Sequence, residues 1–336
     1  MAAVRAFAPG RVNLIGDHTD HTGGLVLPMA VDLGTTVEGE PGGEEVVLRS
    51  EWAEDEVRVP LAVADPTAVS PAWARYVAGV VAELRPEAGF VGTVTTTLPV
   101  GAGLSSSAAL EVAVAVALGA DLADPVALAQ LCQRAEQRAS GVPCGIMDQL
   151  AGTAGLAGHA LRIDCHDLSI QPVPLPSAID VWVVHSGQER SLSGSAYAER
   201  AEACQRAEAV VGPLRRAGLD SIEVIDDPTV RRRARHVVTE NDRVNALVEA
   251  LAVEDGAAIG EVLASSHASL RDDFEVSTPA LDALVAELVA TPGVIGARLT
   301  GAGFGGCAVA LAEAGTPLPA DRRAWLVRPS AGARLL

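Results

Sequence analysis

One segment of the chain combines residue types that can bind a phosphate group. Residues 98–111 read LPVGAGLSSSAALE, and an Ala-, Val- and Leu-rich stretch follows. Gly101 and Gly103 would let the backbone approach a ligand closely. Ser105 to Ser107 can cap the helix that the apolar stretch predicts, and the N-terminal end of that helix attracts anions. An ordinary capped helix after a turn is the alternative, but two glycines before three serines favour phosphate binding.

A second polar segment lies near the N-terminus. Residues 8–24 read APGRVNLIGDHTDHTGG, so that Asp17, His18 and Asp20 are crowded together with Arg11 upstream. These side chains offer directional donors and acceptors, which suit the hydroxyl groups of a polar ligand. A polar hairpin loop after a strand would give the same pattern, and this segment alone leaves both interpretations open.

A third segment is rich in glycine but does not fit a dinucleotide site. Residues 298–307 read RLTGAGFGGC, and Gly301, Gly303 and Gly306 formally satisfy the GxGxxG fingerprint. That fingerprint opens a βαβ unit and needs an acidic residue about 20 positions later. Residues 307–312 are too apolar and too short for the required helix. We therefore predict a glycine-lined loop against the active site, and we do not expect a nicotinamide oxidoreductase.

The basic residues exclude several classes of enzyme. The chain has no lysine, and all 25 of its basic residues are arginines. P-loop NTPases, protein kinases and pyridoxal-phosphate enzymes each depend on a lysine. A protein of this composition that binds ATP must hold the phosphates mainly with backbone N–H groups and helix dipoles.

Charge and cysteine content restrict partners and compartment. The net charge of −18 disfavours nucleic acid and anionic membranes. The arginines at 231–235 are predicted to form a solvated helix face. Five scattered cysteines without a CxxC pair indicate neither a disulfide framework nor a zinc site. No long apolar run and no signal-peptide pattern are present, so we expect a soluble, cytoplasmic protein.

The supporting elements predict an α+β fold. The chain has 336 residues, enough for two domains of about 100–200 residues each. Strands and helices mix without regular βαβ alternation. We place the boundary between an N-terminal domain, 1–165, and a C-terminal domain, 166–336. Strands are expected at 46–49, 57–59, 91–98, 160–163, 181–185, 297–300, 308–312 and 325–327, and helices at 108–118, 125–140, 196–211, 228–252, 259–270 and 279–290.

Together, and in this order, the three segments resemble the galactokinase family of the GHMP kinase superfamily. The resemblance extends over nearly the whole chain and includes WARYVAG at 73–79, GVPCGIMDQ at 141–149, GSAYAER at 194–200 and SHASLRDD at 266–273. It implies two α+β domains with ATP and a sugar in the cleft between them.

The resemblance also implies a role for each matching residue. Asp148 looks like the catalytic aspartate, with Arg11 beside it. Ser107 and Glu136 resemble the partners of Mg²⁺. The sugar-binding set would be Asp17, His18, Asp20, the Gly145 backbone and Tyr197. The ATP-binding set would be Gly101, Ala102, Gly103, Leu104, Ser105, Ser106, Ser107 and Trp73, with Tyr76 in the same segment as Trp73.

The implied activity is ATP-dependent phosphorylation of the anomeric hydroxyl of a sugar, with galactose as the first expectation. Three departures from the family pattern bear on the sugar: Asp17 replaces a glutamate, His21 a tyrosine and Glu189 a basic residue. The alternatives are another hexose, an amino sugar or a pentose as the substrate, or a non-catalytic galactose sensor. ATP and Mg²⁺ are the expected cofactors, and we expect a monomer whose partners are small molecules.

Overall fold

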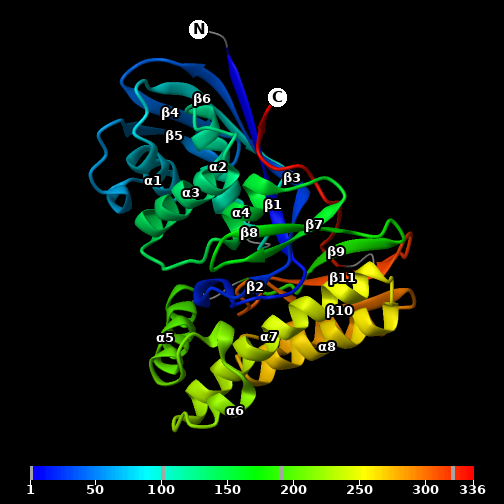
Figure 1. The fold of residues 1–336 in the computed structure, drawn as a ribbon. Coiled ribbons are helices and arrows are strands. Elements are labelled where there is room, and N and C mark those ends of the chain that lie inside the picture. Colours follow the sequence, from blue (N-terminus) through cyan, green and yellow to red (C-terminus); the bar gives the residue numbers. More distant parts are fainter. Residues whose placement is uncertain (1–2, 100–102, 190–192, 319–321) are drawn as a thin grey trace.

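The computed structural model describes residues 3–99, 103–189, 193–318 and 322–336. Figure 1 shows an N-terminal half that packs helices on a sheet, above a C-terminal half of the same kind. This arrangement confirms the α+β fold. Because aromatic residues make up only 3% of the chain, the buried cores consist mainly of Ala, Val and Leu.

The N-terminal half contains a six-stranded sheet with the strand order β13-β1-β3-β6-β4-β5. Its pairs are antiparallel except β4 with β6, which is parallel. The C-terminal strand β13 pairs with β1, so the last residues of the chain return to the first sheet. The strands are β1 (Val4–Asn13), β3 (Pro28–Pro41), β4 (Glu45–Ser50), β5 (Ala53–Pro60), β6 (Phe90–Thr96) and β13 (Arg334–Leu335).

Helices α1, α2 and α4 pack against this sheet, and α3 packs on these three helices. Helix α2 is apolar on nearly every side, and its residues from Ala108 onward are buried. A helix that is hydrophobic all round belongs inside a core, so the N-terminus of α2 is held in place by the surrounding elements. The helices are α1 (Ala74–Leu84), α2 (Ser106–Ala117), α3 (Pro125–Ser140) and α4 (Met147–Ala154), with short 3₁₀ turns at Asp20–Thr22 and Pro66–Ala68.

The C-terminal half contains an antiparallel sheet with the order β10-β11-β9-β12. Helices α8 and α9 pack on β10, and α7 packs on α8. The strands are β9 (Ile179–His185), β10 (Val294–Thr300), β11 (Cys307–Glu313) and β12 (Ala324–Val327). The helices are α5 (Ser193–Val211), α6 (Leu219–Ile222), α7 (Pro228–Ala252), α8 (Gly256–Asp272) and α9 (Pro279–Val289), with a 3₁₀ turn at Leu214–Arg216.

A small third sheet lies between the two halves, with the order β2-β7-β8. Its strands are β2 (Leu25–Val26), β7 (His159–Asp164) and β8 (Ser169–Pro174). The division that we place after residue 165 falls in the turn between β7 and β8, and it stays a prediction. Within the described ranges, no helix is long and apolar enough to cross a membrane.

The expectation for the arginine cluster at 231–235 is wrong in part. Arg233 is only 2% exposed, and its guanidinium contacts the Asp273 carbonyl and the Glu275 carboxylate. Arg232 pairs with the same glutamate, while Arg231 and Arg235 pair with Glu223. The cluster therefore holds α7 to neighbouring segments.

Candidate active site

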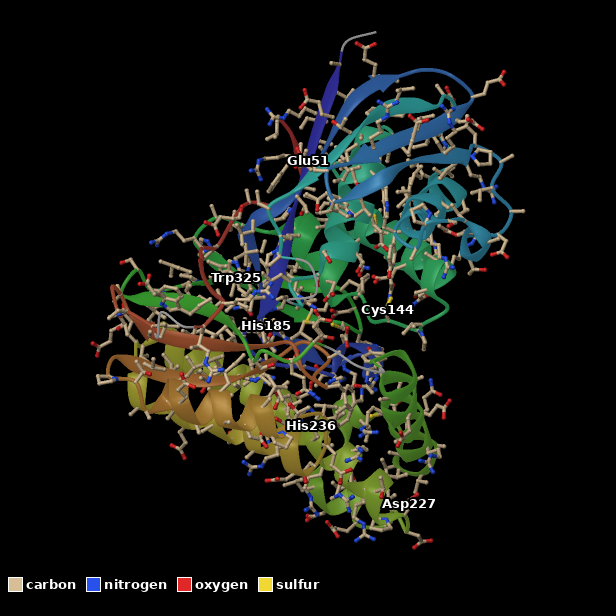
Figure 2. All side chains as sticks on the ribbon, turned by 180° about the vertical axis from the view of Figure 1, so that it is seen from behind. Glu51, Cys144, His185, Asp227, His236 and Trp325 are labelled. Carbon is tan, nitrogen blue, oxygen red and sulfur yellow. The ribbon has the colours of Figure 1, made fainter. Side chains whose placement is uncertain are left out.

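A cavity of about 540 Å³ lies between the two halves. Figure 2 shows Cys144 and His185 near it, on segments from opposite halves. Residues from the three glycine-containing segments line the cavity, so the fold brings these distant segments together. The lining includes Arg11, Asp17, His18, Asp20, Tyr76, Gly103, Ser105, Ser106, Ser107, Glu136, Gly145, Asp148, His185, Glu189, Tyr197, Gly301, Ala302 and Arg323.

Asp148 and Arg11 form a bidentate ion pair in this cavity. Arg11 projects from β1, and Asp148 lies in the first turn of α4. The Nε and Nη2 atoms of Arg11 donate to the two carboxylate oxygens at 2.7 and 2.8 Å. Nη1 of the same guanidinium donates to the carbonyl of Gly103 at 2.6 Å. One arginine therefore orients both the carboxylate and the loop before α2.

The loop before α2 differs from its predicted form at Ser105. Ser105 occupies the N-cap position of α2, but its side chain makes no capping hydrogen bond. Its hydroxyl donates to Oδ2 of Asp148 instead. The N–H groups of the first helical turn have no partner within the helix and can bind an anion. Gly103 has a φ of 76°, in the left-handed region that favours glycine. Gly101 and Ala102 lie outside the described residues.

Two carboxylates lie behind the loop, on α2 and α3. Oε1 of Glu136 accepts a hydrogen bond from the Ser107 hydroxyl at 3.0 Å. The Gln149 amide donates to Glu136 and, at 3.3 Å, to Glu111. Burial and then the charge of Asp148 raise the pKa of Glu136 to about 7, and burial raises the pKa of Glu111 well above its usual value. The sequence did not single out Glu111 or Gln149, since Glu111 falls in a run typical of an ordinary helix and an uncharged glutamine alone indicates no chemistry.

His18 offers the cavity a hydrogen-bond acceptor. Its Nε2 lies 3.2 Å from the carbonyl oxygen of Ala302. A carbonyl only accepts hydrogen bonds, so this contact requires the proton on Nε2 and leaves Nδ1 as an acceptor. Nδ1 is buried and has no partner among the described residues. Burial is the main cause that lowers the pKa of His18 well below its ordinary value, and the electrostatic effect of the nearby His21 lowers it further. The ring is therefore neutral at neutral pH.

Asp20, Gly145 and Tyr197 meet on one side of the cavity. A Cβ atom on Gly145 would lie 1.8 Å from Oδ2 of Asp20, so the carboxylate packs directly on the glycine. Burial raises the pKa of the Tyr197 hydroxyl well above its usual value, and the nearby Gly145 backbone opposes this shift. Burial and then the nearby charge of Asp148 raise the pKa of Asp20 to about 7.

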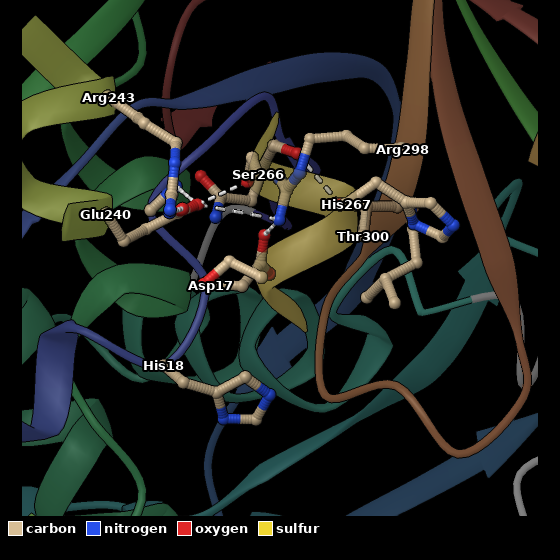
Figure 3. Close-up of polar contacts among 12 residues, drawn as sticks. Asp17, His18, Glu240, Arg243, Ser266, His267, Arg298 and Thr300 are labelled. Carbon is tan, nitrogen blue, oxygen red and sulfur yellow. Dashed lines mark hydrogen bonds and ion pairs between the residues drawn. The ribbon is translucent and has the colours of Figure 1, made fainter. Parts of the chain in front are cut away.

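Asp17 is almost fully buried, and both of its carboxylate oxygens contact protein groups. Oδ1 accepts a hydrogen bond from the Gly301 amide at 2.8 Å, and Oδ2 lies 2.5 Å from Nη2 of Arg298. Figure 3 shows this pair beside Glu240, which in turn pairs with Arg243. Asp17 thus links the N-terminal polar segment, residues 8–24, to the glycine loop between β10 and β11.

Family models match the chain in three places. A galactokinase galactose-binding signature matches residues 2–41, a GHMP kinase N-terminal domain matches 75–155, and a GHMP kinase C-terminal domain matches 247–325. Human galactokinase is 44% identical over 325 residues, which span 91% of this chain and 83% of that protein. The galactokinase of Chloroflexus aurantiacus is 41% identical over 339 residues, which span 92% and 84%. The chain belongs to the galactokinase family.

Solved structures agree with this assignment. A crystal structure of Lactococcus lactis galactokinase complexed with galactose superposes with a TM-score of 0.89 at 31% identity, covering 99% of this chain and 95% of that one. The mevalonate kinase of Methanococcus jannaschii has a TM-score of 0.70 at 19% identity, covering 98% of each chain, and shows the shared GHMP kinase fold. The predicted family and fold are therefore confirmed.

The two aromatic residues of the segment at 73–79, which the resemblance assigns to ATP binding, lie in different places. Tyr76 lines the cavity, whereas Trp73 is not among the lining residues. Trp73 instead packs edge-on against Trp52, with ring centroids 5.9 Å apart. A contact between Trp73 and the nucleotide stays a prediction of the sequence.

The glycine loop at 301–306 is followed by strand β11, without the helix that a dinucleotide site requires. Gly301 and Ala302 line the cavity, which agrees with the predicted loop against the site. Through the Gly301 amide and the Ala302 carbonyl, this loop contacts both Asp17 and His18. It therefore positions two residues that the resemblance places in the sugar site.

Proposed function

We propose that this protein transfers the γ-phosphoryl group of ATP to the anomeric hydroxyl of galactose and releases galactose 1-phosphate and ADP. The observation that carries the proposal is the bidentate Arg11–Asp148 pair beside the N-terminus of α2. A carboxylate held next to an anion-binding helix end can accept a hydroxyl proton while the phosphate is held in line.

In the proposed reaction, the anomeric oxygen attacks the γ-phosphorus and the bond to the β–γ bridging oxygen breaks. Asp148 takes the proton of the attacking hydroxyl. Arg11 and Ser105 fix the orientation of the carboxylate from two sides, so little reorganisation is needed when the sugar binds. Arg11 also stabilises the charge that accumulates around the transferred group.

The proposed sugar site consists of His18, Asp20, Gly145 and Tyr197. Nδ1 of neutral His18 would accept a hydrogen bond from a sugar hydroxyl, since its other ring nitrogen donates to the Ala302 carbonyl. The Asp20 carboxylate offers a second acceptor, and Tyr197 lines the same cavity. Asp17 also lines the cavity, and it positions the glycine loop through its contacts with the Gly301 amide and the Arg298 guanidinium.

Ser107 and Glu136 fit a magnesium ion that ATP brings with it. They supply a hydroxyl and a carboxylate oxygen 3.0 Å apart at the cavity wall. Among the described residues no cluster of three or more His, Cys, Asp or Glu side chains could hold a metal. The Ser107 hydroxyl and the Glu136 carboxylate nevertheless suit Mg²⁺, which often binds one or two protein carboxylates together with substrate phosphates and water. When bound, the ion would neutralise part of the triphosphate charge.

A coupled ADP-release assay over a panel of sugars tests the proposal. The panel contains galactose, glucose, galactosamine, N-acetylgalactosamine and arabinose. The proposal requires galactose to give the highest kcat/KM, with galactose 1-phosphate as the product identified by NMR. A higher kcat/KM for another sugar would replace galactose as the substrate. Galactose binding in calorimetry without any ADP release would instead favour the sensor.

A further inference from the structure

The charges that line the cavity do not suit a triphosphate. Among the described residues, five carboxylates line it, on Asp17, Asp20, Glu136, Asp148 and Glu189, against two guanidinium groups, on Arg11 and Arg323. Arg11 is already bound to Asp148 and to the Gly103 carbonyl. Because the chain has no lysine, the guanidinium of Arg323 becomes the main candidate for a direct contact with the nucleotide phosphates.

The backbone of Arg323 is held by a hydrogen bond, whereas its guanidinium group forms no ion pair among the described residues. Arg323 immediately precedes β12, and its carbonyl accepts a hydrogen bond from the His185 amide at 2.8 Å. Its guanidinium lies over the ring of Trp325, 5.8 Å from the centroid, and has no carboxylate partner among the described residues. Figure 2 shows Trp325 close to His185. The adjacent Arg322, in contrast, is engaged with Glu287.

The strands next to Arg323 share a hydrophobic core with residues that flank the phosphate-binding loop. Leu98 and Leu104, at the two ends of that loop, share one hydrophobic core with Val183 of β9 and Val327 of β12. The cavity wall formed by His185 and Arg323 therefore belongs to the same packed unit as the loop.

We propose that Arg323 binds a phosphate oxygen of the nucleotide from the C-terminal half of the protein. The proposal rests on the proposed function. A guanidinium offers a planar pair of donors that match a phosphate and stays charged at every relevant pH. Arg323 would thereby supply the direct positive charge that a lysine supplies in P-loop proteins. It would also link the two halves across the bound nucleotide.

Calorimetric binding of ATP, ADP and adenosine to wild type and Arg323→Ala tests the proposal. Arg328→Ala is the matched control, because Arg328 is an exposed arginine just after β12 that does not line the cavity. We expect Arg323→Ala to weaken ATP binding about 5- to 20-fold, in the range of an exposed charge-assisted hydrogen bond. Adenosine binding and the melting temperature should stay unchanged. Arg323→Lys should recover part of the affinity.

Two outcomes would overturn the proposal. ATP affinity in Arg323→Ala equal to that in Arg328→Ala would show that Arg323 does not contact the nucleotide. An equal loss for ATP and adenosine would show a contact with the nucleoside and not with the phosphates. Binding is measured without turnover, so this result stands apart from the choice of sugar. If the wild type binds ATP but phosphorylates no sugar, the proposed function fails. The binding measurements on Arg323→Ala would still show whether Arg323 contacts the phosphates.

Discussion

Arg298 and Asp17 form an ion pair inside the protein, with Nη2 and Oδ2 2.5 Å apart and both side chains at most 2% exposed. Nη1 of Arg298 also donates to the Leu14 carbonyl at 3.1 Å. The pair therefore fastens β10 to the segment that follows β1. Since Asp17 also accepts from the Gly301 amide, the glycine loop of the sugar site depends on this contact.

Replacement of Asp17 by asparagine should destabilise the protein. The amide keeps the shape of the carboxylate but leaves the buried Arg298 guanidinium without its counter-charge, which typically costs about 3–5 kcal/mol. Urea unfolding should show this loss, whereas Asp32→Asn, at an exposed position, should change little. Unchanged stability in Asp17→Asn would show that Glu240, 3.9 Å from Arg298, suffices as the counter-charge.

Asp20→Asn should stabilise the protein at high pH and weaken sugar binding. The pKa of Asp20 is raised from 3.8 to about 7 by burial, by Asp148 and by Asp17. A carboxyl with a raised pKa is favoured in its protonated form, so its ionisation costs stability as the pH rises from about 4 to 7. The melting temperature of the variant should exceed that of wild type by a few degrees at pH 8. The two should converge at pH 4. A constant difference across this range would contradict the cause we assign.

Gly145→Ala should impair sugar binding by displacing the carboxylate of Asp20. A Cβ atom at this position would lie 1.8 Å from Oδ2 of Asp20, a distance that neither group can accommodate in place. We expect KM for the sugar to rise about 10-fold or more, since a lost hydrogen bond to a charged group is worth about 1.5–3 kcal/mol. Gly218→Ala, with no atom within 4 Å of the new methyl group, is the control. Equal sugar KM values in the two variants would refute this arrangement.

Ser105→Ala should lower kcat with little change in the affinity for ATP. The hydroxyl of Ser105 donates to Oδ2 of Asp148, so its loss leaves the carboxylate held by Arg11 alone, which contacts both oxygens. A decrease of about 10-fold is expected from the loss of one orienting hydrogen bond. The neighbouring Ser106→Ala serves as a comparison. A rise in KM for ATP without a change in kcat would place Ser105 among the nucleotide contacts, as the sequence first suggested.

Helices with strong end signals were predictable to the residue. Helix α3 runs from Pro125 to Ser140 because Asp124 caps it, proline occupies its first position, and Gly141 ends it in the left-handed conformation. Helix α7 likewise begins after a capping aspartate and a proline. Helices α1 and α4 were missed, since neither has a side-chain cap at its N-terminus and α4 is only 8 residues long.

Strand β1 was also missed, because its sequence contains Pro9 and Gly10, which usually indicate a turn. A register shift between Pro9 and Arg11 accommodates them within the sheet. Asp17, His18, Asp20 and the serines at 105–107 were identifiable from their types and spacing, whereas Asp148, Glu136 and Tyr197 were named only through the family resemblance. The partners of these residues were not identifiable, because contacts such as Asp17 with Arg298 or Ser105 with Asp148 arise only when distant segments pack together.

The most direct test of the account is the turnover of Asp148→Asn with galactose and ATP. Asparagine keeps the size of the side chain and can still contact Arg11 and Ser105, but it cannot accept the proton of the sugar hydroxyl. We predict that kcat falls about 10²- to 10⁴-fold, while galactose binding by calorimetry stays close to wild type; the variant folds with a lower melting temperature, because Arg11 loses its counter-charge. A folded variant that keeps more than about half of the wild-type kcat would contradict the assignment of Asp148 as the proton acceptor.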